Sequence, residues 1–150
     1  MTNRILILPI AALALGAGAP PPAAHGSKIT VTVTDVRNGK GLLRACLVSS
    51  ESDFPECKKA AGHHATSVDA HQGEVTFAFE QVKPGSYAIA LLHDENANGK
   101  ADRALGMIPK EGFGFSRDAP VRMGPPKFSE AAFDMADKDK AMTIRMRYLL

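Results

Sequence analysis

The strongest constraint on the fold is a period of two among the apolar residues of several short segments. In residues 28–36, Ile29, Val31 and Val33 alternate with threonines. Alternation of β-branched residues is typical of a strand with one buried face. Similar strands are expected at residues 42–49, 74–80, 87–93 and 142–148, with shorter ones at 113–116 and 132–135. No segment is long enough for a crossover helix, so we predict an all-β, antiparallel sandwich of about seven strands.

Two segments stand out from this pattern. Residues 87–93 (YAIALLH) are apolar at nearly every position, which indicates a central strand buried on both faces. Residues 50–73 are polar and show little periodicity, so we expect a long loop there.

The N-terminal residues have the pattern of a secretory signal peptide. Arg4 precedes an apolar run at residues 5–15, and small residues and prolines follow. Cleavage is expected before Ser27, with an earlier position after Ala19 as the alternative. The apolar run is shorter than a membrane span, which needs roughly 20 residues, although a membrane anchor is the competing interpretation. We therefore predict a signal peptide at residues 1–26, a single domain at residues 27–150 without a membrane span, and a periplasmic or secreted location.

The charge balance excludes one class of function. The chain has 18 Lys and Arg against 16 Asp and Glu, a formal net charge of +2. A nearly neutral chain has no electrostatic basis for binding nucleic acid. The sequence also shows no Lys/Arg cluster and no basic amphipathic helix of the kind that binds membrane surfaces.

The chain has two cysteines, Cys46 and Cys57. In an oxidising compartment an even pair usually forms a disulfide. A metal or redox role is the alternative, but the spacing is too wide for a redox Cys-x-x-Cys motif. We predict that Cys46 and Cys57 form a structural disulfide.

The segment richest in potential ligands is residues 94–102 (DENANGKAD). Side-chain oxygens stand at alternate positions, and Gly99 occupies the position where a calcium loop turns sharply. Calcium binds about six to eight oxygens, and alternate residues of a tight loop can direct oxygens to one centre. The predicted ligands are Asp94, Asn96, Asn98, Asp102 and the carbonyl of Lys100. A plain polar turn is the alternative, because Asp, Asn and Gly are also turn formers.

The match to a calcium loop is partial. An EF-hand carries a bidentate Glu at position twelve of the loop, and this chain has Leu105 there. Glu95 and Glu111 are the nearest candidates for a substitute carboxylate. With so few loop carboxylates, we expect weak calcium binding, with a Kd of about 10⁻⁴–10⁻³ M.

Other patterns give alternative functions. His63 and His64, with His71 and His93, could bind a transition metal. The acidic residues around the loop, Glu95, Asp102 and Glu111, could act in an envelope hydrolase. Ser116, in the segment that begins at Gly114, does not complete a Gly-x-Ser-x-Gly nucleophile elbow. Phe113 and Phe115 must be buried or presented to a partner, and burial is the commoner case.

Several of these segments also carry a family resemblance. The blocks at residues 84–88 (PGSYA), 93–100 (HDENANGK), 106–116 (GMIPKEGFGFS), 126–128 and 131–133 are similar to exported bacterial proteins of domain-of-unknown-function family 2141. The resemblance implies an immunoglobulin-like or transthyretin-like β-sandwich outside the cytoplasm and implies no activity. We therefore expect a non-enzymatic binding or structural module that has an envelope or extracellular ligand.

Overall fold

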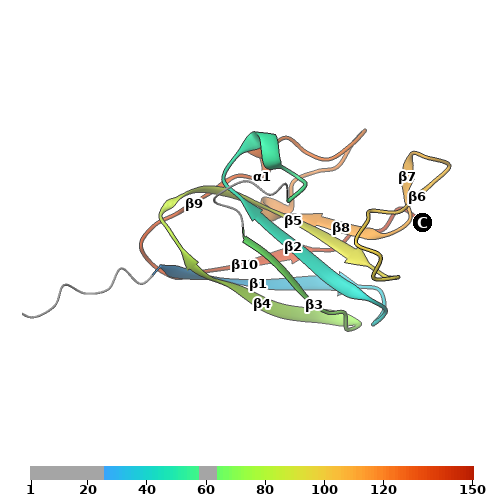
Figure 1. Ribbon diagram of the computed structural model, residues 1–150, viewed down its shortest axis with the longest axis horizontal. Helices are drawn as coiled ribbons and strands as arrows, with labels where there is room; N and C mark the ends of the chain where they lie inside the picture. The colour runs from blue at the N-terminus through green and yellow to red at the C-terminus, as the bar shows by residue number, and fades with distance from the viewer. Residues whose placement is uncertain (1–25, 58–63) are drawn as a thin grey trace, which may run out of the picture.

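Two facing sheets make up the fold in the computed structural model, which describes residues 26–57 and 64–150. The first sheet has the strand order β10-β1-β4, and the second has the order β3-β2-β5-β8, with β9 also pairing with β5 (Figure 1). The strands are β1 (Ser27–Val36), β2 (Leu42–Val48), β3 (His64–Asp69), β4 (Gly73–Val82), β5 (Gly85–Asp94), β6 (Arg103–Ala104), β7 (Ile108–Pro109), β8 (Gly112–Phe115), β9 (Phe133–Met135) and β10 (Lys140–Arg145). Two 3₁₀ turns, η1 (Glu51–Asp53) and η2 (Ser116–Asp118), and one short helix, α1 (Phe128–Ala131), complete the described elements.

The predicted β-sandwich is confirmed. Both sheets contribute alternate residues to one core, for example Val31 and Phe77 from the first sheet and Leu47 and Ile89 from the second. Burial of each such side chain contributes about 1.5–3 kcal/mol. Because the period of two places these side chains on one face of each sheet, their burial holds the two sheets together.

The strand pairing differs from the prediction in one respect. Most pairs are antiparallel, but β1 and β10 run parallel, with Val31 opposite Met142. Parallel neighbours need a long connection, and here the whole chain between β1 and β10 supplies it.

The predicted loop at residues 50–73 is partly wrong, because residues 64–69 form the edge strand β3, which pairs with β2. Only one face of β3 is even partly buried, and Val68 is the one large apolar residue on that face. An edge strand with so few apolar residues has too weak a periodicity to be found from sequence. The hairpin β6–β7 was not predicted either, because its two-residue strands are too short to show a periodicity.

Strand β5 is buried on both faces, as predicted for residues 87–93. On the face away from the main core, Ala88 and Ala90 pack with Phe115 under a cover that includes Phe54 and Phe128. The Phe54 ring meets the Phe115 and Phe128 rings edge-on, with centroids 5.7 and 6.1 Å apart. Phe115 is thus buried rather than presented to a partner.

Ser116 fastens this cover to the sheet. Its buried hydroxyl donates to the carbonyl oxygen of Ala131 at 2.6 Å and accepts from the backbone N–H of Ile89 at 2.9 Å. The side chain is therefore used for structure and connects β5 with α1.

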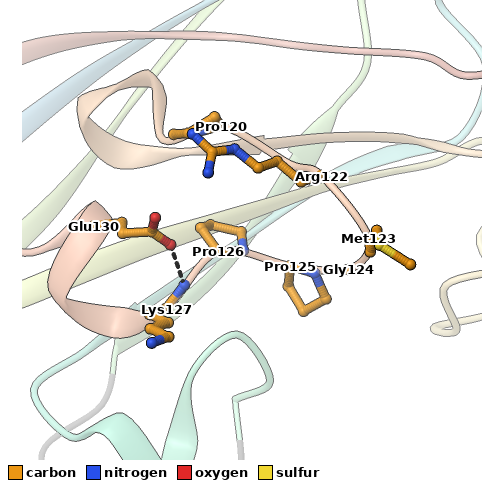
Figure 2. A pocket seen from close by; sticks show the side chains of 8 residues that line it. All are labelled: Pro120, Arg122, Met123, Gly124, Pro125, Pro126, Lys127 and Glu130. Carbon is orange, nitrogen blue, oxygen red and sulfur yellow. Dashed lines mark hydrogen bonds between the residues drawn. The ribbon is translucent and has the colours of Figure 1, made fainter.

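The loop between η2 and α1 borders an open hollow of about 230 Å³ (Figure 2). Its lining residues are Pro120, Arg122, Met123, Gly124, Pro125, Pro126, Lys127 and Glu130. The Glu130 carboxylate accepts from the backbone N–H of Lys127 at 2.8 Å and fixes the start of the helix. Most of these side chains are exposed, so the hollow is a feature of a surface loop.

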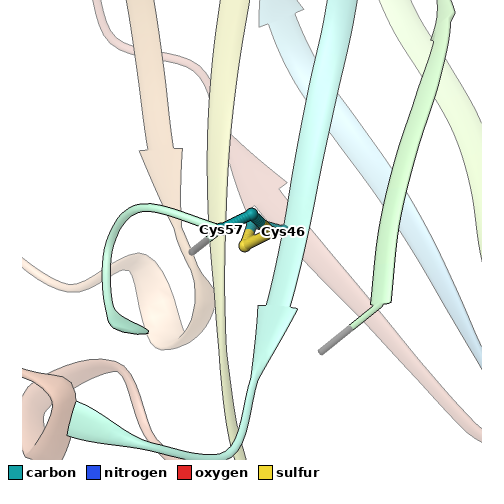
Figure 3. The surroundings of a disulfide bond; sticks show 2 residues. All are labelled: Cys46 and Cys57. Atoms are coloured by element: carbon teal, nitrogen blue, oxygen red, sulfur yellow. A yellow bond between two sulfur atoms is a disulfide. The ribbon is translucent and has the colours of Figure 1, made fainter. Parts of the chain in front are cut away.

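The predicted disulfide between Cys46 and Cys57 is confirmed (Figure 3). Cys46 lies on the outer face of β2, and Cys57 follows η1. The bridge therefore ties the segment that contains Phe54 to the face of the second sheet that Phe54 covers.

Within residues 26–57 and 64–150, no helix has the length and apolar character needed to cross a membrane.

Candidate functional site

Asp94 organises the loop that follows β5. It is the last residue of the strand and is fully buried. Its Oδ1 accepts from the backbone N–H of Asn98 at 3.0 Å, and its Oδ2 accepts from that of Gly99 at 2.8 Å. Gly99 has a φ of 77°, a left-handed conformation that glycine adopts at little cost.

Arg44 on β2 supplies the charge that balances Asp94. Its Nε donates to Asp94 Oδ2 at 2.6 Å. Burial on its own would raise the pKa of Asp94, but the hydrogen bonds from Arg44, Gly99 and Asn98 outweigh it, and the pKa is lowered. Asp94 is therefore held as a carboxylate.

The remaining polar side chains of the loop converge. Asn96 Oδ1 accepts from the backbone N–H of Asn98 at 3.1 Å, and Asn98 Oδ1 accepts from that of Lys100 at 2.8 Å. The Nδ2 groups of Asn96 and Asn98 both donate to Asp102 Oδ2, at 2.7 and 3.0 Å. Four of the predicted ligand residues are thus brought together, and Lys100 takes part through its backbone N–H.

Glu111 joins the two ends of the loop. It is buried just before β8, and its two oxygens accept from the backbone N–H groups of Glu95 at 3.2 Å and Asp102 at 3.1 Å. Burial is the main cause of the raised pKa of Glu111, and the carboxylates of Asp94 and Asp102 add to it. The residue considered from sequence as a substitute ligand therefore lies beside the loop and holds its backbone.

A second ion pair joins Glu95 of the loop to Arg37, which follows β1, and this pair was not predicted from the sequence. Arg37 Nε and Nη2 donate to the two oxygens of Glu95 at 2.8 and 2.6 Å, a bidentate arrangement, and Asn38 Nδ2 adds a third bond at 2.6 Å. Chiefly because of Arg37, the pKa of Glu95 is lowered to about 2. The Arg37 guanidinium also lies 4.5 Å from the centroid of the Tyr148 ring.

His93 is buried behind this pair and both of its ring nitrogens are bonded. Nε2 lies 2.8 Å from the carbonyl oxygen of Lys40, which can only accept, so Nε2 is the donor. The Tyr148 hydroxyl accepts from the backbone N–H of Arg37 at 3.1 Å and lies within hydrogen-bond distance of Nδ1, at 2.8 Å. Both ring nitrogens of His93 are therefore occupied by hydrogen bonds, and neither is free to bind a metal.

The other histidines are separated. His64 begins β3, whereas His71 lies beyond the far end of that strand, and His63 lies outside the described residues. Within the described ranges, no group of three or more His, Cys, Asp and Glu side chains is placed to hold a metal by itself. Any cation at the loop would therefore also need amide or backbone oxygens.

An open hollow of about 290 Å³ lies over these residues. Lys40, Glu95, Asn96, Asp102, Lys110 and Glu111 line it. The lining combines both signs of charge with amide groups, and its acidic members are the three residues considered for a hydrolase. The pKa values of Glu95 and Glu111 are displaced in opposite directions.

These features define a small, disulfide-bonded β-sandwich with a hydrogen-bonded acidic loop at one end. The model of the family described as "uncharacterized protein conserved in bacteria", domain of unknown function 2141, matches residues 31–143, so the chain belongs to that family. The match begins within β1, ends within β10 and includes the whole 94–102 loop, and the resemblance seen in the sequence is confirmed. No curated protein and no solved structure matches the chain.

Proposed function

We propose that the protein is an exported, non-enzymatic binding or structural module and that residues 94–102 bind calcium. The observation that carries the calcium proposal concerns three side-chain oxygens at alternate positions. In the part of the chain that the structure describes, the Oδ1 atoms of Asp94, Asn96 and Asn98 each accept one backbone hydrogen bond. A carbonyl or carboxylate oxygen has two lone pairs, so each atom keeps one for a cation.

The donor set suits a hard divalent cation. All the candidate ligands are oxygens, and the Asp102 carboxylate already meets the side chains of Asn96 and Asn98. Asp94 Oδ2 pairs with Arg44, so Oδ1 is the Asp94 oxygen expected to reach the ion. Bound calcium would supply positive charge between Asp94 and Asp102 and would add to the stability of the loop at the rim of the hollow.

Thermal unfolding with calcium, magnesium and chelator tests this proposal. At ten times its Kd, calcium should stabilise the folded state by about 1.4 kcal/mol, which is about 4 °C for a chain of this size. The Asp102→Asn variant keeps the shape of the side chain but should lose this gain, whereas Asp137→Asn in an exposed turn should keep it. A chain that gains no stability at millimolar calcium, or an equal gain in Asp102→Asn, would refute the calcium site.

Export is supported by the N-terminal pattern and agrees with the disulfide, which persists in oxidising compartments. The intact mass of the protein recovered from the periplasm of a producing bacterium measures the N-terminus directly. We expect a chain that begins at Ser27, and a chain that still begins at Met1 would contradict export by signal cleavage.

The enzymatic alternative has one observation in its favour, the opposite displacement of the Glu95 and Glu111 pKa values at the same hollow. We favour the non-enzymatic function because Glu111 is committed to two backbone N–H groups and Glu95 to Arg37. Hydrolysis of glycan or ester substrates that disappears in Glu111→Gln would reverse this preference.

A further inference from the structure

The hairpin β6–β7 exposes apolar residues at its tip. Leu105 and Met107 are 91% and 78% exposed, and Ile108 beside them is 38% exposed. The hairpin begins directly after the 94–102 loop, and Figure 1 shows it standing apart from the two sheets. Three large apolar side chains within four positions of one turn form an exposed apolar tip rather than scattered surface residues.

The conformation of Leu105 shows that the fold itself does not call for this residue. Leu105 and Gly106 have φ values of 49° and 73°, and the backbone N–H of Met107 donates to the carbonyl oxygen of Ala104 at 3.1 Å. Two left-handed central residues define a type I′ turn, which strongly favours Asn before Gly. Leucine here is disfavoured by the backbone and gains nothing from packing.

Basic side chains lie at the base of the hairpin, at the end opposite its apolar tip. Lys100 precedes the hairpin, Arg103 lies on β6 and Lys110 follows β7, and all three are exposed. The strands bring the latter two to the same end, because Arg103 pairs with Pro109 and the Lys110 N–H donates to the Asp102 carbonyl at 2.9 Å. Apolar residues at a tip with cations behind them match the interface of a membrane with anionic headgroups.

We propose that the β6–β7 hairpin docks on an anionic lipid surface. Leu105, Met107 and Ile108 enter the boundary between headgroups and acyl chains, and Lys100, Arg103 and Lys110 contact the phosphates. A narrow convex tip favours this occupant over a protein, because a stable protein interface buries about 800 Å² on each side. A lipid surface accepts a projecting tip of any shape. This inference goes beyond the proposed function and does not depend on calcium.

Vesicle flotation of the whole protein, purified as the producing cell processes it, tests the inference. The vesicles contain phosphatidylglycerol mixed with phosphatidylcholine, or phosphatidylcholine alone, and chelator is present so that calcium plays no part. We expect binding to the mixed vesicles that weakens with added salt. The double variant Leu105→Asn/Met107→Gln should bind at least about ten-fold more weakly than the parent. Asn at position 105 preserves the turn. Met123→Gln, at an equally exposed methionine in another loop, should bind like the parent.

A second pair of variants tests the cations. Arg103→Gln/Lys110→Gln should weaken binding roughly twenty-five-fold, at about five-fold for each cation near the surface. Lys83→Gln/Lys138→Gln makes the same change in net charge at exposed positions elsewhere and should have little effect. The inference is overturned if the parent does not bind the mixed vesicles or if Leu105→Asn/Met107→Gln binds them equally well. It is also overturned if the hairpin instead mediates self-association without vesicle binding.

Discussion

Replacement of Glu95 by Gln removes the charge of the Arg37–Glu95 pair and nearly preserves its shape. The depression of the Glu95 pKa from 4.5 to about 2 corresponds to at most about 3.4 kcal/mol, since one pKa unit is worth about 1.36 kcal/mol. The Glu95 and Arg37 side chains are 20% and 33% exposed, so solvent screening reduces this value. We expect Glu95→Gln to lower the free energy of unfolding by about 2 kcal/mol at pH 7.

The pH dependence gives an independent measure of the same contribution. The folded-state pKa of Glu95 is below the unfolded value, so its contribution is complete above pH 4.5 and is lost as the pH falls towards 2. Urea unfolding between pH 7 and pH 2, with chelator present, should show the parent losing about 2 kcal/mol more than Glu95→Gln. Glu111 titrates in both proteins, so its opposite contribution cancels in the comparison.

Glu80→Gln is the matched control, because Glu80 pairs with Lys28 at 3.2 Å on the surface, where both side chains are about half exposed or more. A surface pair of this kind contributes less than about 1 kcal/mol. If Glu95→Gln and Glu80→Gln have the same stability, or if the parent and Glu95→Gln lose stability equally in acid, the reasoning about this pair is refuted.

Three further predictions concern other contacts that hold the sandwich together. Ser116→Ala leaves two buried backbone groups without their partner and should cost about 2–4 kcal/mol in urea unfolding. The double variant Cys46→Ser/Cys57→Ser opens a bridge with a sequence separation of 11 residues, and should cost about 3 kcal/mol; the same loss should appear in the parent on reduction. At Gly112 an added Cβ would overlap the Tyr148 ring, so Gly112→Ala should lower the melting temperature at a cost of about 1–3 kcal/mol. An unchanged stability in any of these variants would contradict the contact assigned to it.

The sequence predicted the parts of the fold that repeat a local rule. Alternating apolar residues in β1 and β4 report burial directly, because a strand with one face in the core must alternate. In β3, His64, Thr66 and Val68 face inwards, and one large apolar residue in three cannot establish a period. The parallel pairing of β1 with β10 has no local signal, because it depends on where the last strand joins the first sheet.

The candidate site likewise contains some features that a local sequence pattern predicts and others that have no such pattern. The oxygens of Asp94, Asn96 and Asn98 follow from their spacing within one loop. The Arg37–Glu95 pair joins residues that lie 58 positions apart in sequence, and they meet because the two sheets pack with the ends of β1 and β5 close together. The role of Glu111, which accepts hydrogen bonds from backbone N–H groups at both ends of the loop, was not predicted, because nothing in the neighbouring sequence indicates it.

The same hydrogen bonds predict how calcium and folding are related in this protein. Backbone N–H groups already bind Asp94, Asn96, Asn98 and Glu111, and Arg44 already balances the buried charge of Asp94. A loop ordered in this way needs no metal to fold, unlike small metal-dependent domains that unfold when the metal is removed. Chelator should therefore lower the melting temperature only to that of the metal-free chain and leave the β-sheet circular dichroism spectrum unchanged at 25 °C. Loss of that spectrum in chelator would show that the hydrogen bonds do not order the loop and that the metal does.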